Sequence, residues 1–223
     1  GASFFDVLED VRHKFGVVPV PLQIPIGEAE RFEGVIDLIS QKAIYWDADS
    51  QGEKFEEKQI PDALKSEAFI WRERMLDALS TFSDEITELI LSEEEVSEEL
   101  IKQEIKRGLI SLAIVPVLCG SARRNIGIQP LLDAIVEYFP SPLEVPAIVA
   151  HNIKKDENVN VPCKVDAIPL ALIFKIQYER EKGLLCYARI YSGSIKTGNT
   201  LFNVAKGKRE RVGRILRMHS NKQ

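Results

Sequence analysis

Apolar residues recur at helical spacing in the first half of the chain. The positions of Phe4, Val7 and Val11 predict a helix over residues 3–15. A longer apolar stripe follows Pro61, and proline suits the first turn of a helix. The members of this stripe are Leu64, Ala68, Trp71, Met75, Ala78 and Phe82. Both segments are expected to pack their apolar faces into a core.

Two more helices are expected before residue 140. Ser97 can cap a helix whose apolar positions run to Leu109. A further helix is expected to begin near Gly127 and to end near Phe139.

Extended segments are expected between these helices. Residues 17–26 contain three prolines, each of which biases the preceding residue away from helix. Short strands are predicted over residues 32–39 and 42–46, and the apolar run at residues 113–118 predicts another. The first part of the chain is therefore expected to be mixed α/β.

The pattern changes after a proline-rich linker at residues 140–146, where we place a domain boundary. Alternating apolar residues predict four strands, over residues 170–177, 184–190, 200–204 and 212–218. The polar stretch at residues 151–166 is expected to be a flexible loop. Because four strands leave an edge unpaired, we expect an all-β, incomplete barrel.

Charge is distributed unevenly along the chain, whose net charge is −5. Residues 47–104 are rich in Asp and Glu, whereas residues 206–222 contain seven Lys and Arg against one Glu. This asymmetry indicates either different partners for the two parts or two solvated faces. The apolar runs are too short to span a membrane, and the three cysteines lack metal-ligand spacing. We expect a cytoplasmic protein with reduced thiols and no membrane partner.

Motifs for phosphate binding and catalysis are absent from the sequence. It contains no Gly-x-x-x-x-Gly-Lys-[Ser/Thr] loop to cradle phosphates and no complete Asn-Lys-x-Asp motif to read a base. His13, His151 and His219 lie far apart, in different predicted elements. We therefore expect no catalytic residue and no metal ligand in this chain.

A turn of small residues joins a predicted strand to a predicted helix. The apolar run at residues 113–118 leads into a Cys-Gly-Ser-Ala turn at residues 119–122, where backbone N–H groups can meet a ligand. Together with residues 125–142, this segment resembles the end of the GTP-binding domain of translational GTPases. The resemblance implies that the backbone N–H groups of Ser121 and Ala122 approach the guanine carbonyl oxygen.

Other segments narrow the resemblance. Residues 189–201, which read Arg-Ile-Tyr-Ser-Gly-Ser-Ile-Lys-Thr-Gly-Asn-Thr-Leu, are similar to the second-domain signature of the same GTPases. Residues 19–27, 32–39 and 42–46 resemble the subdomain that the elongation factor G family inserts into its GTP-binding domain. Residues 1–5 resemble the start of the helix that follows the base-reading motif in that family.

The resemblance implies an internal segment with three parts. Residues 1–18 and 113–140 would form the C-terminal part of a P-loop GTPase domain of the α/β class. Residues 19–112 would be an inserted α+β subdomain, and residues 141–223 an incomplete translation-factor β-barrel.

The resemblance also implies what the intact protein does. It would be a ribosomal translocase that hydrolyses GTP to drive movement of tRNA and mRNA during translation elongation, in the cytoplasm or in an organellar matrix. GTP and Mg²⁺ would bind to the intact protein, and neither is expected to bind to this chain, which should be inactive alone and monomeric.

Two ribosome-facing surfaces are implied as well. The helix after Pro61 resembles the part of the family that meets the ribosomal stalk protein, through Glu67, Glu73 and Asp77. The basic segment near the end resembles a surface that faces ribosomal RNA. Its candidate contacts are Arg209, Arg211, Arg214 and Arg217.

Alternative functions remain open from the sequence. A ribosome-recycling paralogue or a peptide-release GTPase of the same family would look much the same over these residues. A nucleotide-independent adaptor, with an acidic helical part and an RNA-binding barrel, fits the composition too.

Overall fold

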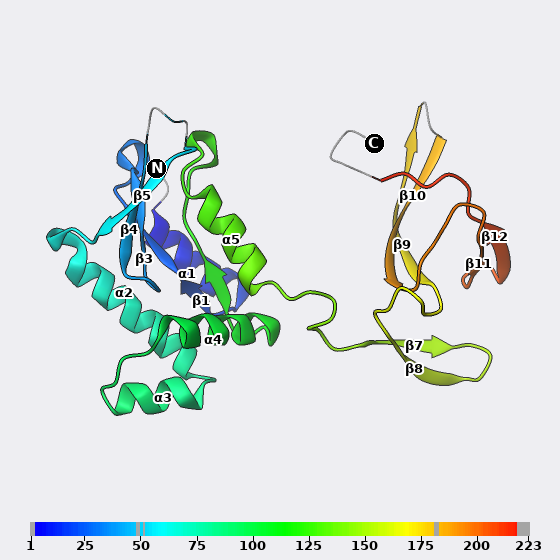
Figure 1. Cartoon of the computed structure of the whole chain (residues 1–223), viewed down its shortest axis with the longest axis horizontal. Helices are drawn as coiled ribbons and strands as arrows, with labels where there is room; N and C mark the ends of the chain where they lie inside the picture. The colour runs from blue at the N-terminus through cyan, green and yellow to red at the C-terminus, as the bar shows by residue number, and fades with distance from the viewer. Residues whose placement is uncertain (1–2, 48–49, 51, 181–182, 218–223) are drawn as a thin grey trace. The chain divides into compact units, whose positions relative to one another are not determined.

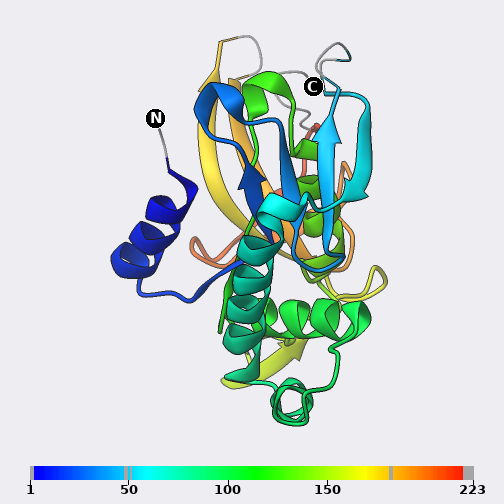
Figure 2. The same ribbon diagram turned by 90° about the vertical axis from the view of Figure 1, so that its left-hand side faces the viewer.

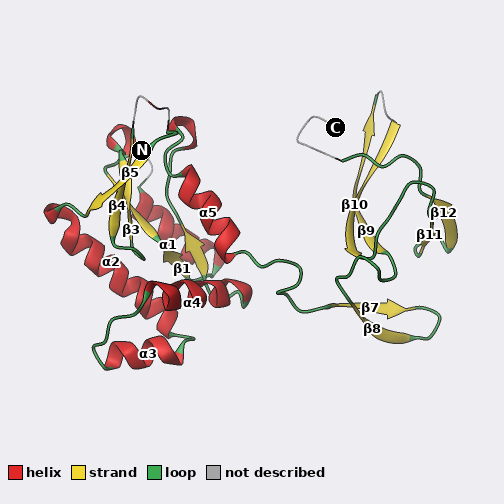
Figure 3. Cartoon of the chain, viewed as in Figure 1, coloured by secondary structure: helices red, strands yellow, loops and turns green. Residues whose placement is uncertain are grey.

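The computed structural model describes residues 3–47, 50, 52–180 and 183–217, and it divides the chain into two compact units, residues 1–140 and 141–223 (Figure 1). The first two residues of the opening motif lie outside the described residues, as does Met218, the last residue of the fourth predicted strand. The first unit mixes helices and strands, whereas the second contains strands and loops (Figure 3).

The predicted first helix is confirmed as α1 (Phe4–Phe15). The Ser3 side chain accepts a hydrogen bond from the Asp6 N–H at 3.4 Å and so caps the N-terminus. Gly16 ends the helix in a left-handed conformation, where glycine carries no steric penalty from a side chain.

A four-stranded antiparallel sheet forms the centre of the first unit. Its order is β2 (Gln23–Ile26), β3 (Gly34–Asp37), β4 (Lys42–Trp46) and β5 (Phe55–Gln59), and the short 3₁₀ helix η1 (Ala29–Arg31) precedes β3. Strand β5 was not predicted, because all five of its residues are exposed and they show no apolar alternation.

A second, two-stranded sheet pairs distant segments in parallel. Strand β1 (Pro19–Pro21) lies beside β6 (Val115–Val117), with Val20 opposite Pro116. Parallel neighbours require a long connection. Here that connection contains, among the described residues, the four-stranded sheet and three α-helices.

The remaining helices of this unit are α2 (Asp62–Ser80), α3 (Asp84–Leu91), α4 (Glu98–Ile110) and α5 (Ile128–Tyr138). Helices α2 and α4 pack against each other, and α3 lies beneath them in Figure 2. Pro61 precedes α2 as its N-cap instead of beginning the helix, and Ser97 caps α4 as predicted. The eight-residue α3 was not predicted. The main core joins the sheets to the helices through Ile24, Ile36, Met75, Leu79, Ile101 and Ile105.

The second unit consists of three antiparallel hairpins among the described residues. They pair β7 (Ile148–Asn152) with β8 (Glu157–Val161), β9 (Leu170–Glu179) with β10 (Gly183–Ser192), and β11 (Thr200–Asn203) with β12 (Lys208–Arg211). No ladder joins one described hairpin to another. The mixed α/β class with several sheets is confirmed, and the barrel stays a prediction.

Two sequence predictions for this unit are wrong. The stretch at residues 151–166 contains most of the β7–β8 hairpin, whose turn is fixed by the Asn152 side chain accepting from the Lys154 N–H at 3.1 Å. No strand covers residues 212–217: the β11–β12 register ends at Arg211, and just beyond it Val212 exchanges backbone hydrogen bonds with Asn199 and Gly198. In the part of the chain that the structure describes, no helix is long and apolar enough to cross a membrane.

Candidate functional site

The Cys-Gly-Ser-Ala turn forms a closed loop between β6 and α5. Ser121 and Ile126 exchange two backbone hydrogen bonds, of 2.8 Å from the Ser121 N–H and 3.1 Å from the Ile126 N–H. Between them lies the 3₁₀ helix η3 (Ala122–Arg124), in which the Arg124 N–H donates to the Ser121 carbonyl at 3.1 Å. The backbone of the loop is therefore fixed at both ends.

Two glycines allow the ends of this loop to approach each other. A Cβ at Gly120 would lie 2.7 Å from the Ile126 carbonyl oxygen, and one at Gly127 would lie 2.7 Å from the Cys119 carbonyl oxygen. Gly127 also has φ +79°, in the left-handed region that favours glycine. No larger residue fits either position without moving the backbone.

The hydrogen bonds of the loop distinguish Ser121 from Ala122 as donors. The Ser121 N–H is already used by the Ile126 carbonyl. Ala122 is exposed, and among the described residues its N–H has no hydrogen-bond acceptor. Ala122 thus offers a backbone donor to an outside ligand, whereas Ser121 shapes the turn.

Arg124 ties this loop to the turn at residues 29–32, which precedes β3. Its guanidinium donates to the carbonyl oxygens of Phe32, Ala29 and Glu30, at 2.6, 3.3 and 3.4 Å. It also lies over the Phe32 ring, 5.8 Å from the ring centroid. No motif in the sequence predicted this role of Arg124.

Gln129, in the first turn of α5, makes a second tie, to the four-stranded sheet. Its side-chain nitrogen donates to the Gly52 carbonyl at 2.7 Å, and its side-chain oxygen accepts from the Trp46 indole at 3.1 Å. Both partners belong to the β4–β5 hairpin region. No sequence motif pointed to this contact.

A small apolar core lies under the loop. Ile126 is buried together with four residues of the four-stranded sheet and of the turn before β3, namely Phe32, Val35, Ile44 and Trp46. Cys119 packs against this cluster, and burial raises the pKa of its thiol to about 12. The thiol therefore stays protonated and acts as an apolar packing group.

The three candidate acids on α2 are exposed. Glu73 and Asp77 are one helical turn apart and share a face, and Glu67 lies at the edge of that face. Phe69 and Ile70 on the same helix are 64% and 50% exposed. This acidic face of α2 therefore presents apolar as well as charged side chains.

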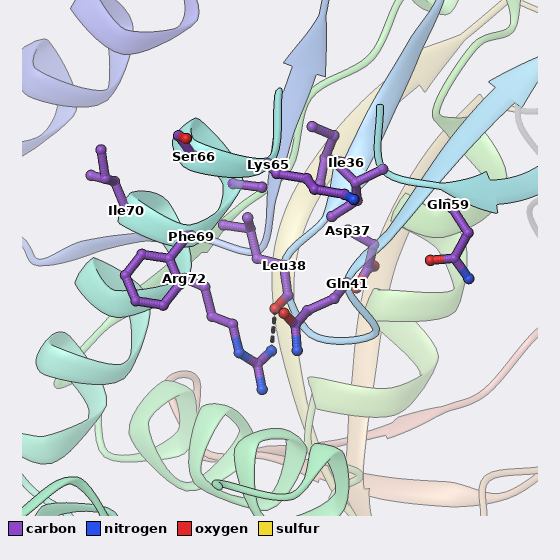
Figure 4. A pocket seen from close by; sticks show the side chains of 12 residues that line it. Ile36, Asp37, Leu38, Gln41, Gln59, Lys65, Ser66, Phe69, Ile70 and Arg72 are labelled. Atoms are coloured by element: carbon purple, nitrogen blue, oxygen red, sulfur yellow. Dashed lines mark hydrogen bonds between the residues drawn. The ribbon is translucent and has the colours of Figure 1, made fainter. Parts of the chain in front are cut away.

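A groove of about 750 Å³ lies beside this face (Figure 4). It is bounded by α2, through Phe69 and Ile70, and by the end of β3, through Asp37. The buried Arg72 closes one side by donating to the Leu38 carbonyl. The groove contains none of the candidate residues inferred from the sequence.

The four candidate arginines lie in the second unit. Arg209 and Arg211 belong to β12, two residues apart and so on one face of the strand. Arg214 and Arg217 follow in a segment without regular structure. All four are exposed, and none forms an ion pair with a described residue. Within the described ranges, no group of His, Cys, Asp and Glu side chains could hold a metal ion.

Relatives match the chain throughout its length. Elongation factor G 1 of Treponema denticola is 57% identical over 222 residues, and elongation factor G 2 of Treponema pallidum is 53% identical over 222 residues. Each alignment covers 100% of this chain and 32% of the relative. The chain is homologous to a segment of elongation factor G. The resemblance inferred from the sequence is thereby confirmed, and the chain spans about a third of the length of these curated relatives.

A solved structure shares the fold of this chain. A crystal structure of a protein from Thermus thermophilus superposes on 95% of this chain with a TM-score of 0.70 and 27% identity. The match covers 28% of that protein. No protein-family model matches the chain.

Proposed function

We propose that this chain is part of a ribosomal translocase that hydrolyses GTP to move tRNA and mRNA during elongation in the cytoplasm. The observation that carries the proposal is the 57% identity to elongation factor G along the whole chain. A specific test is ribosomal translocation by the full-length protein, followed as movement of a fluorescent mRNA. Translocation should require GTP, and a protein that hydrolyses GTP without moving mRNA would contradict the proposal.

The proposed division of the chain is a GTPase-domain end, an insertion and an incomplete barrel. Residues 1–18 and 113–140 would belong to the GTP-binding domain, residues 19–112 to the insertion, and residues 141–223 to the barrel. The parallel β1–β6 pair supports this division, because it brings the two ends of the long insertion together. Among its described residues the second unit has strands and no helix, which supports the barrel.

We assign the guanine contact to the turn at Ser121 and Ala122, with the Ala122 N–H as the donor. A donor at this place favours guanine over adenine, because guanine has a carbonyl oxygen where adenine has an amino group. The exposed and unpaired Ala122 N–H supports the assignment. The chain lacks the motifs for phosphate and for Asn-Lys-x-Asp base reading, so we propose that it supplies no catalytic residue or Mg²⁺ ligand.

Replacement of the donor tests the guanine contact. Ala122→Pro removes the N–H, and the extended backbone of Ser121, with φ −126° and ψ 98°, accepts a following proline. In the full-length protein this change should weaken GDP binding about tenfold, as for loss of one hydrogen bond to a buried base. Ala122→Ser keeps the donor and serves as the control. The isolated chain should show no micromolar GTP binding by calorimetry.

The acidic face of α2 is proposed to meet the ribosomal stalk protein. Exposed carboxylates beside Phe69 and Ile70 suit a partner with basic and apolar groups. The double change Glu73→Lys and Asp77→Lys should slow ribosome-stimulated GTP turnover, and Glu67→Lys should have a smaller effect. Glu85→Lys on α3 reverses an exposed charge elsewhere and should leave turnover unchanged.

The exposed arginines of the second unit are proposed to contact ribosomal RNA. Phosphate contacts release counterions, so each lost contact lowers the salt dependence of binding by about one in the log–log slope. Neutral substitutions of Arg209, Arg211, Arg214 and Arg217 should therefore flatten this slope. Lys154→Gln, in the β7–β8 turn, is the control. An unchanged slope in the arginine variants would contradict this assignment.

A further inference from the structure

Arg124 connects the proposed guanine donor to the turn before β3. Its backbone N–H closes η3 on the Ser121 carbonyl, so its main chain belongs to the same short loop as Ala122. Its side chain leaves the loop and ends on residues 29–32, more than 90 positions away in sequence. One residue therefore links two segments.

The geometry of this link is restrictive. A guanidinium is planar, with donors in a fixed fork, and here it serves three carbonyl oxygens of a single turn. Ala29, at the start of that turn, has φ +52°, an uncommon conformation for alanine. The turn thus offers its carbonyl oxygens to Arg124 in one particular arrangement.

Arg123 provides a contrast within the same 3₁₀ helix. It is exposed, and among the described residues its side chain forms no hydrogen bond, ion pair or ring contact. The two neighbouring arginines carry the same charge close to Ala122. They differ in that the Arg124 side chain is hydrogen-bonded to the turn at residues 29–32, whereas the Arg123 side chain is not.

We propose that Arg124 is a positioning residue for guanine recognition, holding the Ala122 N–H in place through the turn at residues 29–32 of the insertion. This inference rests on the proposed guanine contact at Ala122. It makes the inserted subdomain a structural support of base recognition. Arg124 should affect only the hydrogen bond from the Ala122 N–H to the guanine carbonyl oxygen, because the Arg124 side chain itself is bound to the turn at residues 29–32.

The test uses the full-length protein and two diphosphate probes. GDP carries the carbonyl oxygen, and the diphosphate of 2-aminopurine riboside lacks it but keeps the 2-amino group, the ribose and the phosphates. Arg124→Ala should weaken GDP binding roughly tenfold, which corresponds to a misplaced hydrogen bond, and should leave binding of the second probe unchanged. Arg124→Lys keeps the charge without the fork, and its loss should lie between wild type and Arg124→Ala.

Arg123→Ala is the control, because it removes the neighbouring charge and leaves the contacts of Arg124 in place. Arg123→Ala should alter the affinity for neither probe. Equal weakening of both probes by Arg124→Ala and Arg124→Lys, or no weakening, overturns the positioning role. If the wild-type protein binds both probes equally, the proposed guanine contact itself is wrong. Should Arg124→Ala not fold by circular dichroism, the ratio of the two affinities in Arg124→Lys decides.

Discussion

The Trp46 indole N–H donates a 3.1 Å hydrogen bond to the side-chain oxygen of Gln129, 83 residues later in the chain. The nitrogen of the same Gln129 side chain donates to the Gly52 carbonyl at 2.7 Å. A single amide therefore satisfies one donor and one acceptor on the β4–β5 hairpin region from the first turn of α5. The four-stranded sheet and the candidate turn are joined by specific polar contacts as well as by apolar packing.

Removal of this amide should destabilise the first unit. Gln129→Ala loses both hydrogen bonds and leaves the Trp46 N–H without its partner, so the free energy of unfolding should fall by about 1–3 kcal/mol. Urea unfolding of the chain, followed by tryptophan fluorescence, measures the change. Gln103→Ala replaces an exposed glutamine on α4 and should have little effect. If the two variants unfold at the same urea concentration, the Gln129 contacts contribute no stability.

Arg72 is a buried charge that serves backbone carbonyl oxygens. It is 8% exposed and donates to Leu38, Ile39 and Val96, and burial lowers its pKa. Arg72→Met should lower the free energy of unfolding by about 3–5 kcal/mol, because the carbonyl oxygens would remain buried without donors. Lys65→Met removes only an exposed ion pair with Asp62, and because water screens such a pair the change should have little effect on the free energy of unfolding. Comparable losses in the two variants would contradict this structural role of Arg72.

The sequence predicted elements that show an apolar period or a cap. Strand β4 agrees with its predicted limits, residues 42–46, and the capping serine of α4 was identified. Strand β5 buries none of its residues and therefore produces no periodic signal. In α2 the apolar stripe was found, but the buried Arg72 was missed because a charged residue suggests an exposed position.

The supports of the candidate turn could not be predicted in the same way. The Cys-Gly-Ser-Ala motif consists of four consecutive residues, and its role was inferred from its resemblance to the corresponding turn of translational GTPases. The contacts of Arg124 and Gln129 join residues separated by 92 and 77 positions, and no period or spacing relates them. The sequence implied that the N–H groups of Ser121 and Ala122 are both donors to the ligand. It could not show that the Ser121 N–H is already used, because the Ser121–Ile126 pairing depends on how the loop closes.

Gly127 should not tolerate a side chain. An added Cβ would lie 2.7 Å from the Cys119 carbonyl oxygen, and φ is +79°. Gly127→Ala should lower the free energy of unfolding by more than about 2 kcal/mol, since backbone strain and a backbone clash combine. Gly16→Ala has a similar φ of +63° but open space around its Cβ, so it should cost only about 1 kcal/mol. Urea unfolding of the two variants separates the cost of the steric clash from the cost of the backbone strain. Equal losses in the free energy of unfolding would rule out the close approach between Gly127 and the Cys119 carbonyl oxygen.

Cys119 should make the stability of the chain depend on alkaline pH. Burial raises its pKa in the folded protein to about 12, from 9.0 in the absence of burial. The unfolded chain therefore releases the thiol proton before the folded protein does, and the free energy of unfolding should fall as pH rises above about 9. The stabilising effect is complete below that pH and would be lost by about pH 12. Denaturant unfolding at about pH 8 and about pH 10 measures the difference.

Two cysteine variants distinguish this thiol from other alkaline titrations. Cys119→Ala should reduce the fall in stability between those two pH values, whereas Cys163→Ala, at an exposed position, should retain it. Burial also raises the pKa of Tyr138 above 10.0, which adds a loss of the same sign at higher pH and explains why the comparison stops near pH 10. The same burial should make Cys119 the slowest of the three thiols to react with iodoacetamide, because the thiolate is the reacting form. Equal alkylation rates for Cys119 and the exposed Cys163 would show that the thiol is accessible and ionisable, and the packing role beneath the turn would then be wrong.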